Sequence, residues 1–93
     1  MIRSFRDKDT EGLFNLEPSG RLPPDIQNRA HRKLLRIDAA QMLSDLSVFP
    51  GDCLEKLKGS REGQHSIRIN NQWRICFVWK DGDAYLVEIC DYH

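Results

Sequence analysis

The sequence predicts an α+β fold in which an N-terminal strand and helices pack on a small antiparallel β-sheet. The first half of the chain repeats apolar residues at helical spacing, whereas the second half alternates apolar and polar residues with a period of two. The two halves meet at Pro50-Gly51-Asp52, a turn-forming tripeptide. Compact domains typically hold roughly 100–150 residues, so the 93 residues of this chain are expected to form a single domain, 1–93.

The N-terminal half is predicted to contain a short strand and two helices. Residues 2–5 alternate apolar and polar side chains and predict the strand, and residues 7–16 predict a brief helix. Pro23-Pro24-Asp25 then marks the start of a long helix that runs to about Ile37. Proline is tolerated in the first turn because the backbone N–H that it lacks has no partner there, and the negative charge of aspartate is favourable at the positive end of the helix dipole. Helical periodicity continues through residues 39–46, after a kink.

The C-terminal half is predicted to be a run of antiparallel strands at residues 54–57, 64–69, 72–79 and 83–91. Asn70-Asn71 and Asp81-Gly82 are tight-turn signals, and the second is among the strongest for a hairpin. The strand at 72–79 carries Arg74 on one face. The other face is expected to pack on the helices, and it carries Trp73, Ile75, Phe77 and Trp79.

The composition predicts a folded cytoplasmic protein. Hydrophobic residues make up 40% and charged residues 30% of the chain, and no apolar run reaches the ~20 residues that span a bilayer. The N-terminus is charged almost at once and lacks the apolar stretch of a secretory signal, so we expect neither export nor a membrane partner. The three cysteines are odd in number and widely spaced, which predicts reduced thiols, with Cys76 and Cys90 packed in strands, rather than disulfides or a zinc site.

Charge is balanced overall but unevenly distributed. Fourteen basic residues match fourteen acidic ones, so the net charge does not indicate a nucleic-acid partner. The stretch from Lys56 to Lys80, however, contains six basic residues and only one acidic residue, Glu62. This predicts a local positive field. The chain has no H-E-x-x-H motif, carboxylate cluster or glycine-rich phosphate loop, and we therefore expect neither a metal nor a cofactor.

A set of short segments, taken together in their order and spacing, resembles one family of proteins. The segments are Met1-Ile2-Arg3-Ser4-Phe5, Leu57-Lys58-Gly59, Arg61-Glu62-Gly63, Ser66-Ile67, Trp73-Arg74 and Asp91-Tyr92-His93. The resemblance is to the HigB-type toxins of the RelE superfamily, which are mRNA interferases of bacterial type II toxin–antitoxin systems. It implies a RelE-like fold and an endoribonuclease that cuts mRNA in the ribosomal A site by attack of the RNA's own 2′-hydroxyl, without a metal. It also implies contact with the 30S subunit and its 16S rRNA, and a HigA-like helix-turn-helix antitoxin in a heterotetramer.

Such a cleavage needs a base for the 2′-hydroxyl, cations for the crowded phosphate and an acid for the leaving oxygen. The resemblance implies that Lys58 and Arg74 hold the phosphate, while Asp91, Tyr92 and His93 handle protons. His93 is the first candidate because imidazole titrates near neutrality, although whether it acts as acid or base stays open. Further substrate-binding candidates are Lys56, Arg61, Arg68 and Glu55.

Three readings of individual residues remain open at this point. A buried Arg74 requires either a carboxylate such as Asp91 or Glu88, or an anionic ligand. Glu55 stands where some family members carry a histidine, so it is either a replacement base or a mark of lower activity. Four cations at helical spacing form either an ordinary solvated helix surface or a second site of contact with phosphates, those of ribosomal RNA. These ribosome-contact candidates are Arg29, Arg32, Lys33 and Arg36.

Two other functions compete with the nuclease. The first is a non-catalytic RNA- or ribosome-binding module of the same fold, and the second is a plain protein-interaction domain. The departure at Glu55 favours the binding module, whereas the presence of Lys58, Arg74, Tyr92 and His93 together favours the nuclease.

Overall fold

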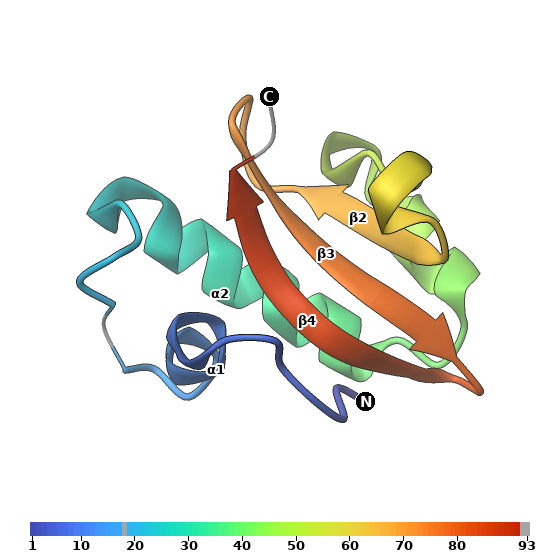
Figure 1. Cartoon of the computed structure of the whole chain (residues 1–93), viewed down its shortest axis with the longest axis horizontal. Helices are drawn as coiled ribbons and strands as arrows, with labels where there is room; N and C mark the ends of the chain where they lie inside the picture. The colour runs from blue at the N-terminus through green and yellow to red at the C-terminus, as the bar shows by residue number, and fades with distance from the viewer. Residues whose placement is uncertain (18, 92–93) are drawn as a thin grey trace.

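The fold is taken from a computed structural model that describes residues 1–17 and 19–91. The chain begins with two α-helices, continues through short 3₁₀ turns and ends in a four-stranded sheet (Figure 1). The expected α+β class is confirmed. The elements are α1 (Lys8–Phe14), α2 (Pro24–Ala39), η1 (Leu43–Val48), η2 (Pro50–Asp52), β1 (Glu55–Lys56), η3 (Gly59–Arg61), β2 (Gln64–Arg68), β3 (Trp73–Lys80) and β4 (Asp83–Asp91).

The sheet is an antiparallel meander in the order β1-β2-β3-β4. Asp81 and Gly82 join β3 to β4, and both have positive φ values, 52° and 83°, as a two-residue hairpin turn requires. The predicted hairpin at this dipeptide is therefore confirmed. The β3–β4 register shifts between Cys76 and Val78, which marks a bulge in the middle of the pair.

The predicted N-terminal strand forms only in part. Ile2 and Phe5 make isolated parallel bridges to Ala84 and Val87 of β4, and the Arg3 N–H donates to the Ala84 carbonyl at 2.7 Å. The segment is thus an extended strap along the edge of β4 rather than a full strand, because it pairs with that strand at separated points.

The two helices begin at the signals that the sequence predicts. The Asp7 carboxylate caps α1 by accepting a hydrogen bond from the Thr10 N–H at 2.7 Å. Pro24 is the first residue of α2, which ends at Ala39. The predicted helical continuation over residues 39–46 is wrong: Ala40 has extended backbone, and the chain re-forms as the separate 3₁₀ segment η1. The Asp45 carboxylate accepts the N–H groups that precede this segment.

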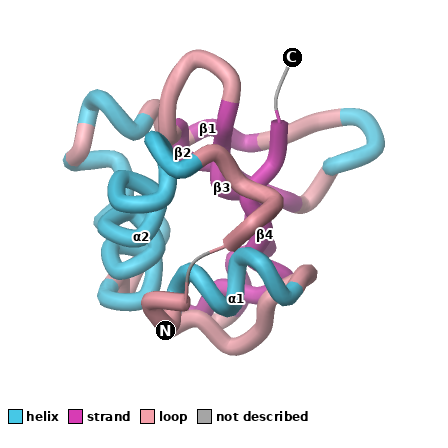
Figure 2. Tube along the Cα trace, turned by 90° about the vertical axis from the view of Figure 1, so that its left-hand side faces the viewer, coloured by secondary structure: helices cyan, strands magenta, loops and turns pink. Residues whose placement is uncertain are grey.

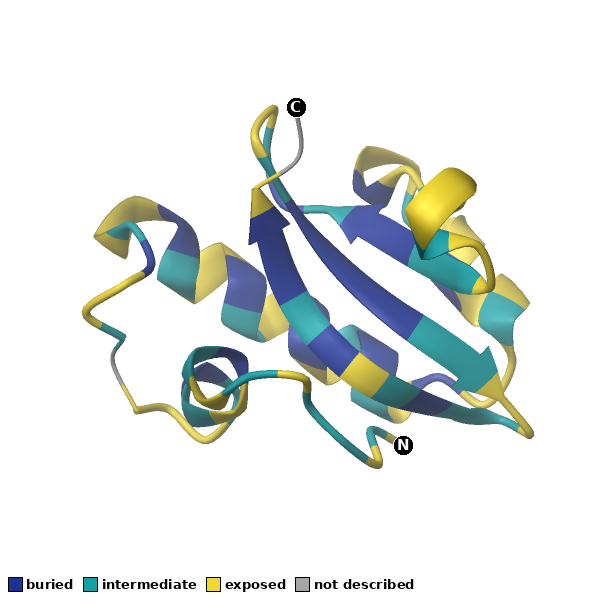
Figure 3. Ribbon diagram, viewed as in Figure 1, coloured by how far each residue is buried: buried dark blue, intermediate teal, exposed yellow. Residues whose placement is uncertain are grey.

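Both helices cover the same face of the sheet, and the core lies between them (Figure 2). Figure 3 shows the buried residues running along α2 and the central strands. Trp73 and Trp79 are partly buried and pack against this core, as the alternation in β3 predicts. The largest fully buried apolar side chains are Ile26, Leu34, Ile37, Leu46, Ile67, Ile75, Phe77 and Val87.

No helix within the described residues is both long enough and apolar enough to cross a membrane.

Candidate functional site

The face of the sheet that points away from the helices carries the polar residues of the candidate site. Strand register places Ser66 opposite Cys76, Cys76 opposite Glu88, and Arg74 opposite Cys90, so all five side chains belong to this face. We call it the open face.

Arg74 is the central cation of the open face. It is only 8% exposed. Its Nε donates to Ser66 Oγ at 2.7 Å, and its Nη2 donates to the Cys53 carbonyl at 2.8 Å. These contacts fix the plane of the guanidinium, so its position is set before any ligand arrives.

The structure identifies a carboxylate near Arg74 that the sequence reasoning did not name for this role. Glu55 Oε2 lies 3.7 Å from Arg74 Nη2, a distance of charge attraction rather than of a hydrogen bond. Glu88, which had been a candidate partner, instead pairs with Arg61 and Arg6. Glu55 therefore sits beside the cation that is expected to bind phosphate.

The loop that carries Lys58 is anchored over the open face. Leu57 packs on Cys76 and Cys90 in a small apolar cluster, so the residue that follows, Lys58, is held beside the β3–β4 pair. Gly59 has a φ of 67°, a left-handed conformation that turns the chain into η3. Lys58 is exposed and lines a hollow of about 500 Å³, together with Glu55, Lys56, Leu57, Ser60 and Arg61.

Arg61 connects this hollow to β4. Its Nη1 lies 2.7 Å from Glu88 Oε1, and this hydrogen bond raises the pKa of the Arg61 guanidinium. Arg61 also lines a second hollow, of about 270 Å³, with Trp73, Cys90 and Asp91. The two hollows thus share one cation, which joins the Lys58 loop to the end of β4.

Asp91 closes β4 opposite Trp73. It is exposed, and its Oδ2 accepts a hydrogen bond from Gln72 Nε2 at 3.1 Å. Tyr92 and His93, the expected proton-handling residues, lie outside the described residues.

Lys56 and Arg68 are less closely associated with this site than the sequence suggested. Lys56 pairs with His65 across the strands, and the His65 ring stacks on Phe77 in the face covered by the helices. By strand alternation, Lys56 belongs to that face too. Arg68 pairs with Arg74 in register, but its guanidinium turns toward Asn70 and Asn71, where it donates to a carbonyl and a side-chain oxygen.

The four helix cations meet Arg68 around a basic hollow of about 630 Å³ between α2, η2 and the β2–β3 turn. Arg29 and Arg32 are exposed, and Arg29 donates to the Ile69 carbonyl at 3.2 Å. The guanidinium carbon of Arg36 lies 4.1 Å from the centre of the Phe49 ring, within cation–π range.

Lys33 does not fit its expected place among exposed cations. It is 8% exposed, its ammonium lies 2.9 Å from Asp52 Oδ1, and it also donates to the Arg68 carbonyl. Asp52, 2% exposed, binds Arg36 at 2.8 Å as well. Sequence reasoning missed this buried carboxylate, because the pairing joins the helix to a turn that local periodicity does not relate to it.

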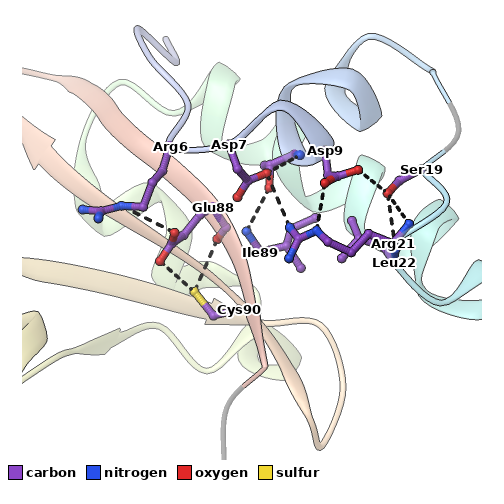
Figure 4. Close-up of polar contacts among 10 residues, drawn as sticks. Arg6, Asp7, Asp9, Ser19, Arg21, Leu22, Glu88, Ile89 and Cys90 are labelled. Atoms are coloured by element: carbon purple, nitrogen blue, oxygen red, sulfur yellow. Dashed lines mark hydrogen bonds and ion pairs between the residues drawn. The ribbon is translucent and has the colours of Figure 1, made fainter.

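Carboxylates and arginines also cluster where the N-terminal segment meets β4 (Figure 4). Arg6 Nε lies 3.4 Å from Glu88 Oε2, and Arg21 pairs with Asp9 at 2.8 Å and with Asp7 at 3.7 Å. Glu88 thereby bridges Arg6 and Arg61 and connects the N-terminal segment to the Lys58 loop. Glu88 and Cys90 are two residues apart in β4 and therefore lie on the same face of the sheet. This spacing was the sequence signal that could have placed Glu88 on the open face.

Comparison with known proteins settles the family. Residues 3–93 match the family described as HigB-like toxin, the RelE-like toxin of type II toxin-antitoxin system HigB. Toxin HigB-1 of Vibrio cholerae serotype O1 is 44% identical over 85 residues, which cover 90% of each chain. Endoribonuclease HigB of Proteus vulgaris is 36% identical over an alignment of 95 residues that covers the whole of both chains. This chain belongs to the HigB-like toxin family.

Membership in a toxin–antitoxin family implies an antitoxin partner and an RNA substrate for this HigB-like chain. Of the residues that the resemblance selects, the fold brings Arg74 and Lys58 to the open face, with Asp91 at its end, and the substrate-binding candidate Arg61 lies beside them. Within residues 1–17 and 19–91, no group of three or more His, Cys, Asp and Glu side chains could hold a metal ion.

Proposed function

We propose that this HigB-like toxin is an endoribonuclease that cuts messenger RNA in the ribosomal A site by metal-independent attack of the 2′-hydroxyl. The observation that carries the proposal is the placement of Arg74 on the open face, below the Lys58–Arg61 loop and next to the end of β4. A relative over the full length, from Proteus vulgaris, is named an endoribonuclease.

Arg74 is suited to stabilise the charge that builds up on the phosphate. Its guanidinium is held by Ser66 and Cys53, so little reorganisation is required when the charge develops. Lys58 supplies a second cation from a solvent-exposed loop, where RNA can reach it. An arginine fixed in place and an exposed lysine together fit the recognition and the neutralisation of one phosphodiester.

Proton transfer is assigned to the C-terminal residues. Asp91 is the last residue of β4, and Tyr92 and His93 follow it in the sequence. A 2′-hydroxyl attack requires one group to accept a proton and another to supply one to the leaving 5′-oxygen. His93 is the first candidate for one of these roles, while Tyr92 stacks on a base or orients the nucleophile.

We further propose that the basic hollow contacts ribosomal RNA of the 30S subunit. Arg29 and Arg32 are exposed at its edge, and Asn70 and Asn71 add amide groups. Charge reversal at Arg32 should weaken association with ribosomes and leave cleavage of a pre-bound complex unchanged. Unchanged affinity for ribosomes would show that this surface is merely exposed to solvent and does not contact ribosomal RNA. The proposed antitoxin is a HigA-like helix-turn-helix protein in a heterotetramer with the toxin.

The test is to map mRNA 5′ ends after expression, with and without active translation. New ends at codon positions are expected, and they should vanish when translation stops. His93→Ala should abolish the new ends while the circular dichroism spectrum stays native, and Lys80→Ala, an exposed cation at the far end of β3, is the matched control. Cleavage that continues without ribosomes, or unchanged cleavage by the His93 variant, would contradict the mechanism.

The alternative is a non-catalytic RNA- or ribosome-binding module of the same fold. The position of Glu55 beside Arg74 favours it, since the carboxylate offsets the charge that would bind phosphate. This alternative predicts ribosome binding without new mRNA ends, and Glu55→His would then be the substitution to examine for a gain of cleavage.

A further inference from the structure

Cys76 and Cys90 lie on neighbouring strands of the open face, with their sulfur atoms 3.1 Å apart. The register pairs Cys76 with Glu88 and Cys90 with Arg74, so the two cysteines occupy diagonal positions across β3 and β4. A disulfide needs a sulfur–sulfur distance of about 2.05 Å, so the two atoms would have to move about 1 Å closer.

The two thiols have different surroundings. Cys76 is fully buried, whereas Cys90 is 8% exposed and lines the smaller hollow with Arg61, Trp73 and Asp91. The Cys90 sulfur also lies 3.2 Å from Glu88 Oε1, as Figure 4 shows. A hydrogen bond from Cys90 lowers the pKa of the Cys76 thiol, with a smaller contribution from the charge of Arg61. That same contact, together with burial, raises the pKa of Cys90. Cys90 is thus the thiol that a small molecule can reach, and Cys76 is the one that forms a thiolate more readily.

We propose that Cys76 and Cys90 are an oxidisable pair that hydrogen peroxide converts into a reversible disulfide, and that this bond suppresses the activity of the neighbouring site. The second half of the proposal rests on the proposed RNA cleavage. In the first step, the Glu88 carboxylate accepts the Cys90 thiol proton while Cys90 sulfur attacks one peroxide oxygen and the O–O bond breaks. The departing hydroxide takes that proton from Glu88 and leaves as water, and Cys90 becomes a sulfenic acid. In the second step, Cys76 sulfur attacks the Cys90 sulfenic sulfur and displaces its hydroxyl, which leaves as a second water with the remaining thiol proton.

The position of the bond gives it a consequence for the site. Diagonal residues of an antiparallel pair lie about 7–8 Å apart, at or beyond the usual Cα reach of a disulfide. Forming the bond therefore requires β3 and β4 to shift, and the shift acts on Arg74 and Asp91, the direct neighbours of Cys90 across and along the sheet. A bond made under strain is also more easily reduced, which suits a reversible change better than a permanent crosslink.

The experiment uses the whole chain with Cys53→Ser, which removes the exposed third thiol and with it crosslinking between molecules. The protein is treated with hydrogen peroxide, alkylated under denaturing conditions, digested and analysed by mass spectrometry. A peptide linked through Cys76 and Cys90 is expected, and dithiothreitol should restore both free thiols. Cleavage of mRNA in a translating extract should fall about tenfold or more on oxidation and recover on reduction, as expected for a misplacement of the order of 1 Å.

Two controls separate the pair from other effects of oxidant. Cys90→Ala and Cys76→Ala, each in the Cys53→Ser background, should keep their own activity through the same treatment, and either variant suffices if the other fails to fold. Recovery of both thiols in alkylated form after peroxide would overturn the proposal, as would a disulfide that leaves cleavage unchanged. If the reduced chain cuts no RNA, the proposed function fails, whereas peptide mapping still decides whether the pair is oxidisable.

Discussion

Replacing Asp52 with alanine should destabilise the protein far more than removing an exposed charge. Asp52 is 2% exposed and binds both Lys33, at 2.9 Å, and Arg36, at 2.8 Å. Removing one partner of a buried ion pair typically costs about 3–5 kcal/mol, because an uncompensated charge stays buried. The Arg36 side chain is 35% exposed and can recover hydration, whereas that of Lys33, at 10%, keeps the Arg68 carbonyl as its partner among the described residues. We therefore expect the lower end, about 3 kcal/mol.

Urea denaturation followed by circular dichroism measures this loss. With a slope of about 1.5 kcal/mol per molar, a loss of about 3 kcal/mol lowers the midpoint by about 2 M. The matched control is Arg32→Ala, an exposed cation on the same helix, which should stay within about 0.5 kcal/mol of the parent. The pair Lys33→Met with Asp52→Leu should be more stable than Asp52→Ala alone, since no buried charge remains.

A loss below about 1 kcal/mol for Asp52→Ala would refute the reasoning, because it would fall in the range of an exposed ion pair. Lys33 would then be a hydrated cation, and it would return to the set that can contact RNA. The expected loss instead assigns Lys33 to the stability of the α2–η2 junction.

Three further predictions test the site and the fold. Arg74→Ala should reduce mRNA cleavage in a translating extract much more than Lys56→Ala, since only Arg74 belongs to the open face; equal losses would contradict this assignment. Burial and the charge of Lys56 lower the pKa of His65, so the unfolded chain binds the proton more readily, and the free energy of unfolding should fall as the pH drops below about 6.5. In the parent the urea midpoint should fall between about pH 7.5 and pH 5.5, and in His65→Phe it should stay nearly constant over this range. If the midpoint of the variant falls as much as that of the parent, His65 is not the cause. Gly82→Ala should cost about 1 kcal/mol in thermal or urea unfolding, because φ is +83° there; an unchanged midpoint would contradict it.

The sheet could be predicted closely because its signals are local. Alternation over β3 and the Asp81-Gly82 turn depend on neighbours in the chain, and they place each strand within a few residues of its observed bounds. The N-terminal strap and the chain after α2, where a helical continuation over residues 39–46 was expected, were predicted less well. The strap is set by its bridges to β4, which is distant in the sequence. The break after Ala39 is set by the Asp45 carboxylate, which accepts the Gln41 and Met42 N–H groups and competes with a continuing helix.

The candidate site divides in the same way. Strand alternation alone identifies Arg74 as the polar residue of a buried strand, and the resemblance adds Lys58. The partners of these cations could not be predicted, because Glu55, Glu88 and Asp52 approach them through the tertiary fold. A helical wheel places Lys33 beside Arg36, and nothing in the wheel reveals that a buried carboxylate lies between them.

The distribution of charge shows why a count of basic residues overstates the surface available to RNA. The stretch from Lys56 to Lys80 is strongly basic in sequence, yet Arg61 is paired with Glu88 and Arg74 lies near Glu55, both outside that stretch. The positive potential of the open face is therefore smaller than the sequence implies. Phosphate binding there must compete with carboxylates, and the affinity of the free protein for short RNA should be weak. Such a balance would require a second surface for binding the ribosome, and the basic hollow, which we propose to contact ribosomal RNA, carries exposed arginines for that role.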